Sequence, residues 1–127
     1  METKSLPRSY PEWRKDPIDR EQDAAYVFGY DLVRHCRDSA IQQAISKAPQ
    51  ELQAPIQQAV DMALHNLLAL LEGFYCLESG PTHKLEYALH VIVRDSTGRI
   101  VERQQVSPCK QDLPIGYHKW SRHREFR

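Results

Sequence analysis

The sequence predicts an α+β fold in two layers, with a helical hairpin packed on a small antiparallel β-sheet. Two observations predict this class: apolar residues recur at helical spacing along two long segments, and after Gly73 the spacing changes to strict alternation. The chain has 127 residues, the length of one domain. We therefore expect an N-terminal arm over residues 1–16 and a single α+β domain over residues 17–127. A basic aromatic tail, about residues 108–127, ends this domain.

The N-terminal arm is predicted to be irregular. Pro7 and Pro11, followed by Pro17, remove backbone donors and disfavour a helix. Tyr10 and Trp13 are large aromatic side chains in this segment. We expect them to hold the arm against the domain.

A first helix is predicted to begin near Asp16, which can cap it, with Pro17 suited to its first position. No proline interrupts residues 19–47, and Pro49 ends the helix because the residue before a proline is pushed out of the helical conformation. At α-helical spacing one broad face is apolar and comprises Ala24, Ala25, Phe28, Leu32, Val33, Cys36, Ala40 and Ala44. The opposite face is charged and comprises Asp31, Arg34, Arg37 and Asp38.

The second helix has the clearest apolar face, and Gly73 is placed to end it. This face comprises Ile56, Val60, Leu64, Leu67, Leu68 and Leu71. Two starts remain open: either Pro49 opens a short turn and Pro55 opens the main helix, or one helix from residue 50 is kinked at Pro55. We favour the first. We expect this helix to be the main source of core stabilisation.

A β-hairpin is predicted to follow. Apolar side chains alternate with more polar ones at Leu85, Tyr87, Leu89, Val91 and Val93. Asp95 and Gly98 suit a turn, since Asp95 can accept from the following amides and Gly98 can adopt a left-handed conformation. Residues 100–106 then return as the partner strand, which Pro108 ends. A lone hairpin is marginal in water, so its apolar face must lie on the helices or be joined by a third strand, for which residues 74–77 are the best candidate.

Composition excludes several broad classes. Seventeen basic residues balance 17 acidic ones, so no bulk field draws the protein to nucleic acid or to an anionic membrane. The longest apolar run, residues 67–71, is far too short to span a bilayer, and the N-terminus lacks a signal-peptide core. Three cysteines at unrelated spacings favour a reducing compartment. We therefore expect a cytoplasmic protein with no metal and no cofactor.

Four titratable residues form the candidate catalytic cluster. Asp31 and His35 lie one helical turn apart, as do Asp61 and His65. In an antiparallel hairpin centred on residue 48, both pairs stand level across the two helices, which is the geometry of a carboxylate-oriented histidine or of a metal site. Each pair also lies on the flank of its apolar face, where surface ion pairs are common. Both interpretations stay open, and the sequence carries no other catalytic motif.

The basic aromatic tail offers candidate partner-binding residues. These are Tyr117, Trp120, Arg122 and Arg124. They suit an acidic protein partner, or a tail folded back on the domain. The alternative is nucleic-acid binding, with the arginines on phosphates and Trp120 stacked on a base.

Three short motifs occur in order: His65-Asn66-Leu67-Leu68, then Leu71-Glu72-Gly73, then Gly116-Tyr117-His118-Lys119-Trp120 after the strand pair. Over residues 60–120 this order resembles a loose group of small, uncharacterised bacterial single-domain proteins. The acidic, tryptophan-bearing loop of that group is absent here. The resemblance implies an immunity or accessory factor of a bacterial competition system, which acts by binding a partner.

These observations predict a small bacterial protein-binding module, with immunity-type inhibition of a toxin as its most concrete form. Its partner is expected to be another protein or a second copy of the chain, and not a membrane. One alternative is an enzyme, metal-dependent or based on His and Asp, that uses the four-residue cluster. The other is nucleic-acid binding through the tail.

Overall fold

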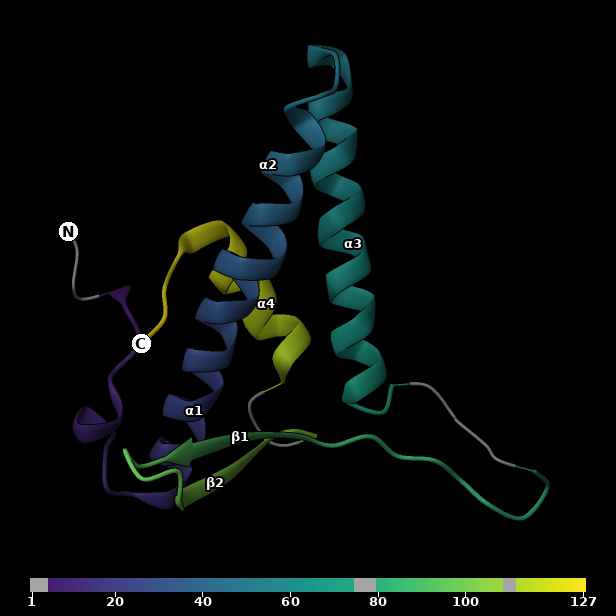
Figure 1. Cartoon of the computed structure of the whole chain (residues 1–127). Helices are drawn as coiled ribbons and strands as arrows, with labels where there is room; N and C mark the ends of the chain where they lie inside the picture. The colour runs from purple at the N-terminus through teal and green to yellow at the C-terminus, as the bar shows by residue number, and fades with distance from the viewer. Residues whose placement is uncertain (1–4, 75–79, 109–111) are drawn as a thin grey trace.

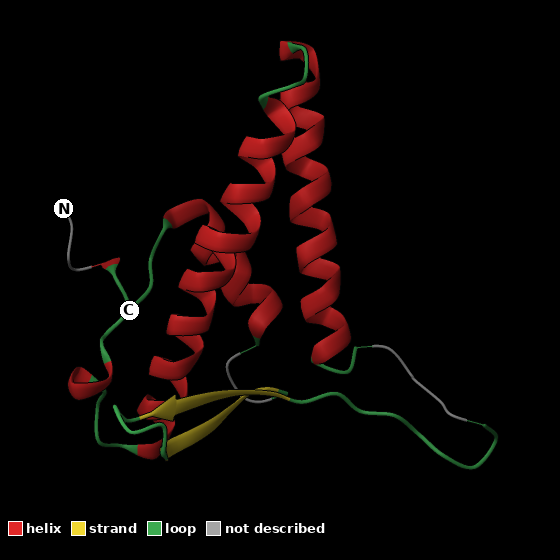
Figure 2. Ribbon diagram, in the orientation of Figure 1, coloured by secondary structure: helices red, strands yellow, loops and turns green. Residues whose placement is uncertain are grey.

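The structure is a computed structural model that describes residues 5–74, 80–108 and 112–127. It has the predicted α+β class, with a layer of helices above a two-stranded antiparallel sheet (Figures 1 and 2). The helices are α1 (Pro17–Asp31), α2 (Ser39–Ile45), α3 (Gln53–Leu71) and α4 (Leu113–His123), and the strands are β1 (Leu89–Arg94) and β2 (Ile100–Ser107). None of the described helices is both long and apolar enough to cross a membrane.

The first predicted helix forms, with a π-helical segment, Leu32–Asp38, joining α1 to α2. Its start is as expected: the Asp16 carboxylate accepts from the Ile18 amide at 3.0 Å, and Pro17 occupies the first turn. A π-turn takes more residues than an α-turn, so side chains in this segment are rotated relative to α-helical spacing. As a result Arg37 is buried and Cys36 is exposed, the reverse of the prediction.

The second helix confirms the short turn after Pro49, whereas its main part begins at Gln53 and not at Pro55. A single 3₁₀ turn, Gln50–Leu52, follows Pro49, and α3 then begins with Pro55 in its first turn. Gly73 ends the helix with φ +79°, and the Phe74 amide donates to the Ala69 carbonyl at 3.1 Å. This is a Schellman C-cap, which satisfies carbonyls left free at the helix end.

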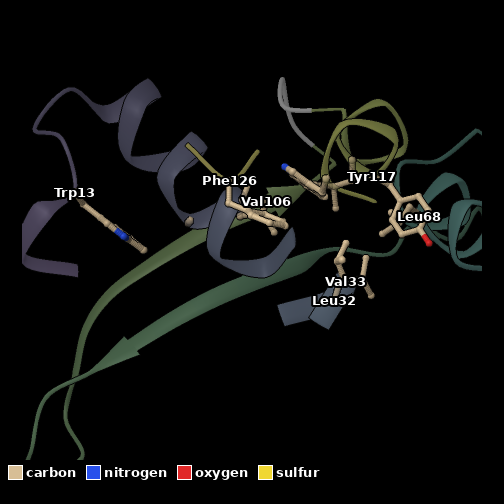
Figure 3. Packing of buried hydrophobic residues seen from close by; sticks show 11 residues of the cluster. Trp13, Leu32, Val33, Leu68, Val106, Tyr117 and Phe126 are labelled. Carbon is tan, nitrogen blue, oxygen red and sulfur yellow. The ribbon is translucent and has the colours of Figure 1, made fainter. Parts of the chain in front are cut away.

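The expectation that α3 dominates the core is wrong. Only Leu68 and Ala69 of α3 are buried, and Leu67 is 46% exposed. The buried cluster lies instead where α1, the π-helical segment, β2 and α4 meet (Figure 3). Its members are Trp13, Ala24, Ala25, Leu32, Val33, Leu68, Val106, Leu113, Tyr117, Trp120 and Phe126.

The hairpin forms with the predicted turn. Asp95 Oδ1 accepts from the Thr97 and Arg99 amides at 2.9 and 3.1 Å, and Gly98 has φ +90°. Pairing begins at Leu89, opposite Ser107, so residues 85–88 run beyond the end of β2 and form no strand. Of the predicted third strand, Phe74 follows the α3 cap as exposed coil, and residues 75–77 lie outside the described residues.

Most of the predicted basic aromatic tail is helical, because residues 113–123 form α4. Asp112 caps this helix, and Tyr117 and Trp120 are turned into the core at 3% and 2% exposure. The chain then returns to the N-terminal arm, where the Phe126 amide donates to the Ser5 carbonyl at 2.9 Å. Trp13 is buried against the same core, so the prediction that it holds the arm is confirmed.

Candidate functional site

A groove runs between α3 and α4 and has a volume of about 610 Å³. Its α3 wall consists of Ala54, Gln57, Gln58, Asp61, Met62, His65 and Asn66. Its α4 wall consists of Tyr117, His118, Ser121 and Arg122. Both walls therefore carry an imidazole, and amide, hydroxyl and guanidinium groups supply hydrogen-bond donors along the groove.

Asp61 ties the groove to the helices behind it. Arg37 donates to it through Nε at 2.6 Å and Nη2 at 3.3 Å, and the Tyr117 hydroxyl donates to Oδ1 at 2.5 Å. Burial raises the pKa of Asp61, but the hydrogen bonds from Arg37 and Tyr117 outweigh burial and hold that pKa below its usual range. Burial, and then the bond to Asp61, raises the pKa of the Tyr117 hydroxyl. Asp61 therefore stays an ionised carboxylate, and the Tyr117 hydroxyl keeps its proton and donates to it.

A second hollow, of about 580 Å³, adjoins the groove and shares Gln57, Asp61, Ser121 and Arg122 with it. Asp38 lies here between two arginines, accepting from Arg37 at 2.8 Å and from Arg124 at 2.6 Å. Burial raises the pKa of Asp38, but the hydrogen bonds and positive charges of Arg124 and Arg37 together outweigh burial, so the net pKa is lowered. A chain of alternating charges thus joins the π-helical segment to α3 and to the end of α4.

The charges lining these two hollows do not cancel. The described lining residues include three arginines, Arg37, Arg122 and Arg124, and two acids, Asp38 and Asp61. Arg37 and Arg124 are paired with the two acids, whereas Arg122 makes no hydrogen bond or ion pair with any residue that the structure describes. One exposed positive charge, Arg122, is therefore left at the boundary of the two hollows.

The structure brings together only half of the candidate catalytic cluster. Asp61 and His65 line the groove, whereas Asp31 and His35 are exposed on the first helix and line neither hollow. Within the described ranges, no group of three or more His, Cys, Asp or Glu side chains is placed to hold a metal ion. An aspartate with a lowered pKa, held by Arg37, suits a structural anchor better than a proton donor.

The candidate partner-binding residues divide in the same way. The expectation that Tyr117 and Trp120 offer an aromatic surface is wrong, because both rings are buried and Trp120 has no free face for a base. Arg122 and Arg124 are exposed, as a surface role requires. The reason is that α4 turns the rings of Tyr117 and Trp120 towards the core, whereas Arg122 lies at the boundary of the two hollows and Arg124, just after the helix, lines the second one.

Arg37 is the site residue that sequence reasoning placed wrongly. The signal that could have found it is the hairpin geometry itself, because a hairpin centred one residue later, on 49, sets Arg37 opposite Asp61.

Comparisons with protein-family models, with curated proteins and with solved structures found no match to this chain.

Proposed function

We propose that the protein is a binding module that takes an acidic segment of a partner protein in the groove between α3 and α4. The observation that carries this proposal is the charge of Arg122, which no described residue pairs, in a groove whose walls also carry amide, imidazole and hydroxyl groups. A partner carboxylate supplies the acid that this guanidinium lacks, and an arginine pairs with a carboxylate through two parallel bonds.

The surroundings of Arg122 favour a carboxylate over a cation or a purely apolar group. The carboxylate of Asp61 already accepts three hydrogen bonds, from Arg37 and Tyr117, so it has little capacity left for an incoming cation. His65 and His118 face the groove from opposite walls and can donate to a second acceptor of the same segment. The groove also contains apolar surface at Met62, which suits a side chain flanking the acid.

Immunity-type inhibition of a toxin is the most concrete form of this proposal. It draws support from the resemblance to small bacterial immunity and accessory proteins, which act by occupying a partner. In this form the acidic segment belongs to the toxin. In cells whose growth is arrested by the toxin that this chain binds, co-expression of the chain should restore growth, and Arg122→Gln should lose that protection.

The binding proposal is tested by titrating isotope-labelled protein with pentaglutamate and following backbone amide shifts. Shifts are expected at His65, Asn66, His118 and Ser121, and they should weaken as salt is raised because the contact is ionic. Pentalysine serves as the matched probe and should leave these amides unmoved. Shifts scattered over the surface, or an equal response to both peptides, would contradict the proposal.

A further inference from the structure

A smaller pocket, of about 170 Å³, lies where α4 packs against α1 (Figure 1). Its α1 wall consists of Gln22, Ala25 and Tyr26, and its α4 wall consists of Ile115, Gly116, Lys119 and Trp120. We call it the α1–α4 pocket. It shares no lining residue with the groove or with the second hollow, because at 3.6 residues per turn Trp120 lies on the opposite side of α4 from Arg122. The pocket is therefore separate from the surface assigned to the acidic partner.

The Tyr26 hydroxyl in this pocket accepts from two donors. Lys119 Nζ donates to it at 2.8 Å and lies 4.9 Å from the centre of the Tyr26 ring. Gln22 Nε2 donates to the same oxygen at 3.4 Å. A hydroxyl has two acceptor lone pairs and one proton, so both lone pairs are used while the proton reaches no acceptor among the residues that the structure describes. Tyr26 therefore keeps one hydrogen-bond donor available.

The other polar side chains of the pocket also present donors. Lys119 makes no ion pair with any described residue, so its positive charge is unmatched and two of its three N–H groups remain. The Gln22 carbonyl oxygen accepts from Arg14 at 2.9 Å, so the amide presents its nitrogen to Tyr26. None of the seven lining residues is acidic. The pocket thus has donors and a positive charge but no anion of its own.

The indole N–H of Trp120 points independently to a missing acceptor. Trp120 is 2% exposed and lines the pocket, and its Nε1 is buried without a hydrogen-bond partner in the described part of the chain. The other indole has a partner, since Trp13 Nε1 donates to the Arg8 carbonyl at 3.1 Å. Buried polar groups are nearly always hydrogen-bonded, because leaving such a bond unmade is costly. An acceptor bound in the pocket would supply what Trp120 lacks.

We propose that the α1–α4 pocket binds a small organic carboxylate. The negative charge pairs with Lys119, and the two oxygens offer about four acceptor positions, enough for the donors of Lys119, Tyr26 and Trp120. The rest of the wall suits an apolar body, because Ala25, Ile115 and Gly116 contribute no polar side chain. The pocket has the volume of about five or six water molecules, so the acid is a short one.

The indole resonances of isotope-labelled protein, followed during titration with butyrate, test this proposal. The chain has two tryptophans, so Trp13 serves as an internal control in every spectrum. The Trp120 indole cross-peak should shift and saturate with a dissociation constant on the order of 1 mM, as expected for a ligand of few atoms. The Trp13 cross-peak should stay in place. Butyramide and butylamine, which have the same chain without the negative charge, should move neither.

Two variants test the assigned contacts. Lys119→Met removes the charge and keeps an unbranched side chain, so it should raise the dissociation constant for butyrate at least about 10-fold. Lys47→Met is the matched control, since Lys47 is exposed between α2 and α3, and it should bind like the wild type. Tyr26→Phe keeps the ring and removes the hydroxyl, and it should also weaken binding.

A Trp120 cross-peak that stays unmoved at saturating butyrate, or that responds equally to butyramide, would overturn the proposal. Equal affinities of Lys119→Met and Lys47→Met would do so as well. Far-UV circular dichroism and an unchanged Trp13 cross-peak show whether each variant keeps the wild-type fold. Arg122→Gln should bind butyrate in this pocket like the wild type, so failure of the pocket and failure of the groove are separable.

Discussion

Removal of one oxygen, in Tyr117→Phe, tests whether the contact with Asp61 fixes α4 against α3. The hydroxyl donates to Asp61 at 2.5 Å from a side chain that is 3% exposed, so it is largely withdrawn from water. A hydrogen bond to a charged acceptor contributes about 1.5–3 kcal/mol. Asp61 keeps its bonds to Arg37 in the variant, so we expect the free energy of unfolding to fall by about 2 kcal/mol.

A double-mutant cycle with Asp61→Asn isolates that contact from the loss of volume and charge. Unfolding by urea, followed by far-UV circular dichroism at neutral pH, should give a coupling energy of about 1–2 kcal/mol between positions 61 and 117. Tyr87→Phe is the control: Tyr87 is 45% exposed, and its hydroxyl makes no hydrogen bond with the described residues, so its effect should stay within about 0.5 kcal/mol. A coupling energy of zero would refute the reasoning.

Three further perturbations act on the scaffold that carries the groove. Gly29→Ala places a methyl group 2.4 Å from the Trp120 ring. This overpacking should lower the free energy of unfolding by about 1–3 kcal/mol, which exceeds the gain in helix propensity, so the melting temperature should fall. An unchanged melting temperature would show that the ring can shift. Hydrogen bonds from Arg20 lower the pKa of Glu102 from 4.5 to about 2, so the stability this carboxylate contributes is complete above pH 4.5 and is lost as the pH falls towards 2. Glu102→Gln should therefore flatten the acid side of the stability profile by on the order of 2 kcal/mol, and an equally steep profile would contradict this. Asp23 is buried and accepts from two arginines of the arm, so Asp23→Asn should speed proteolytic cleavage within residues 5–16, whereas wild-type resistance would exclude a fastening role.

Features fixed by neighbouring residues could be predicted from the sequence. The cap at Asp16, the break at Pro49, the helix end at Gly73 and the turn at Asp95 each depend on a short stretch of chain. The hairpin of helices follows from two such stops and two apolar faces. This is why the α+β class and most element bounds agree with the structure.

Features set by tertiary packing could not be predicted in the same way. The π-helical segment changes the spacing on which the burial of Cys36 and Arg37 was inferred. The helix α4 has Gly116 in its interior, where the Trp120 ring lies against it, and this breaks the apolar periodicity of the tail. The exposure of Leu67 shows that an apolar helical face does not itself say which partner covers it.

The candidate site was accessible to sequence reasoning only in part. Hairpin geometry brought Asp61 and His65 to attention, and both line the groove, but it paired them with Asp31 and His35 of the first helix, which do not. The basic aromatic composition of the tail brought Arg122 to attention, whereas its aromatic neighbour Trp120 belongs to the core. The net charge of zero does not indicate such a site, because it sums over the whole chain and one unpaired arginine in a groove is a local excess of charge.

The affinity for pentaglutamate, compared between Arg122→Gln and Arg103→Gln in one buffer, tests the central claim most directly. Both changes remove one exposed positive charge, the first from the groove and the second from β2. The account predicts that Arg122→Gln raises the dissociation constant at least about 10-fold over that of Arg103→Gln, as expected for loss of a paired carboxylate contact. Equal dissociation constants in the two variants would contradict it.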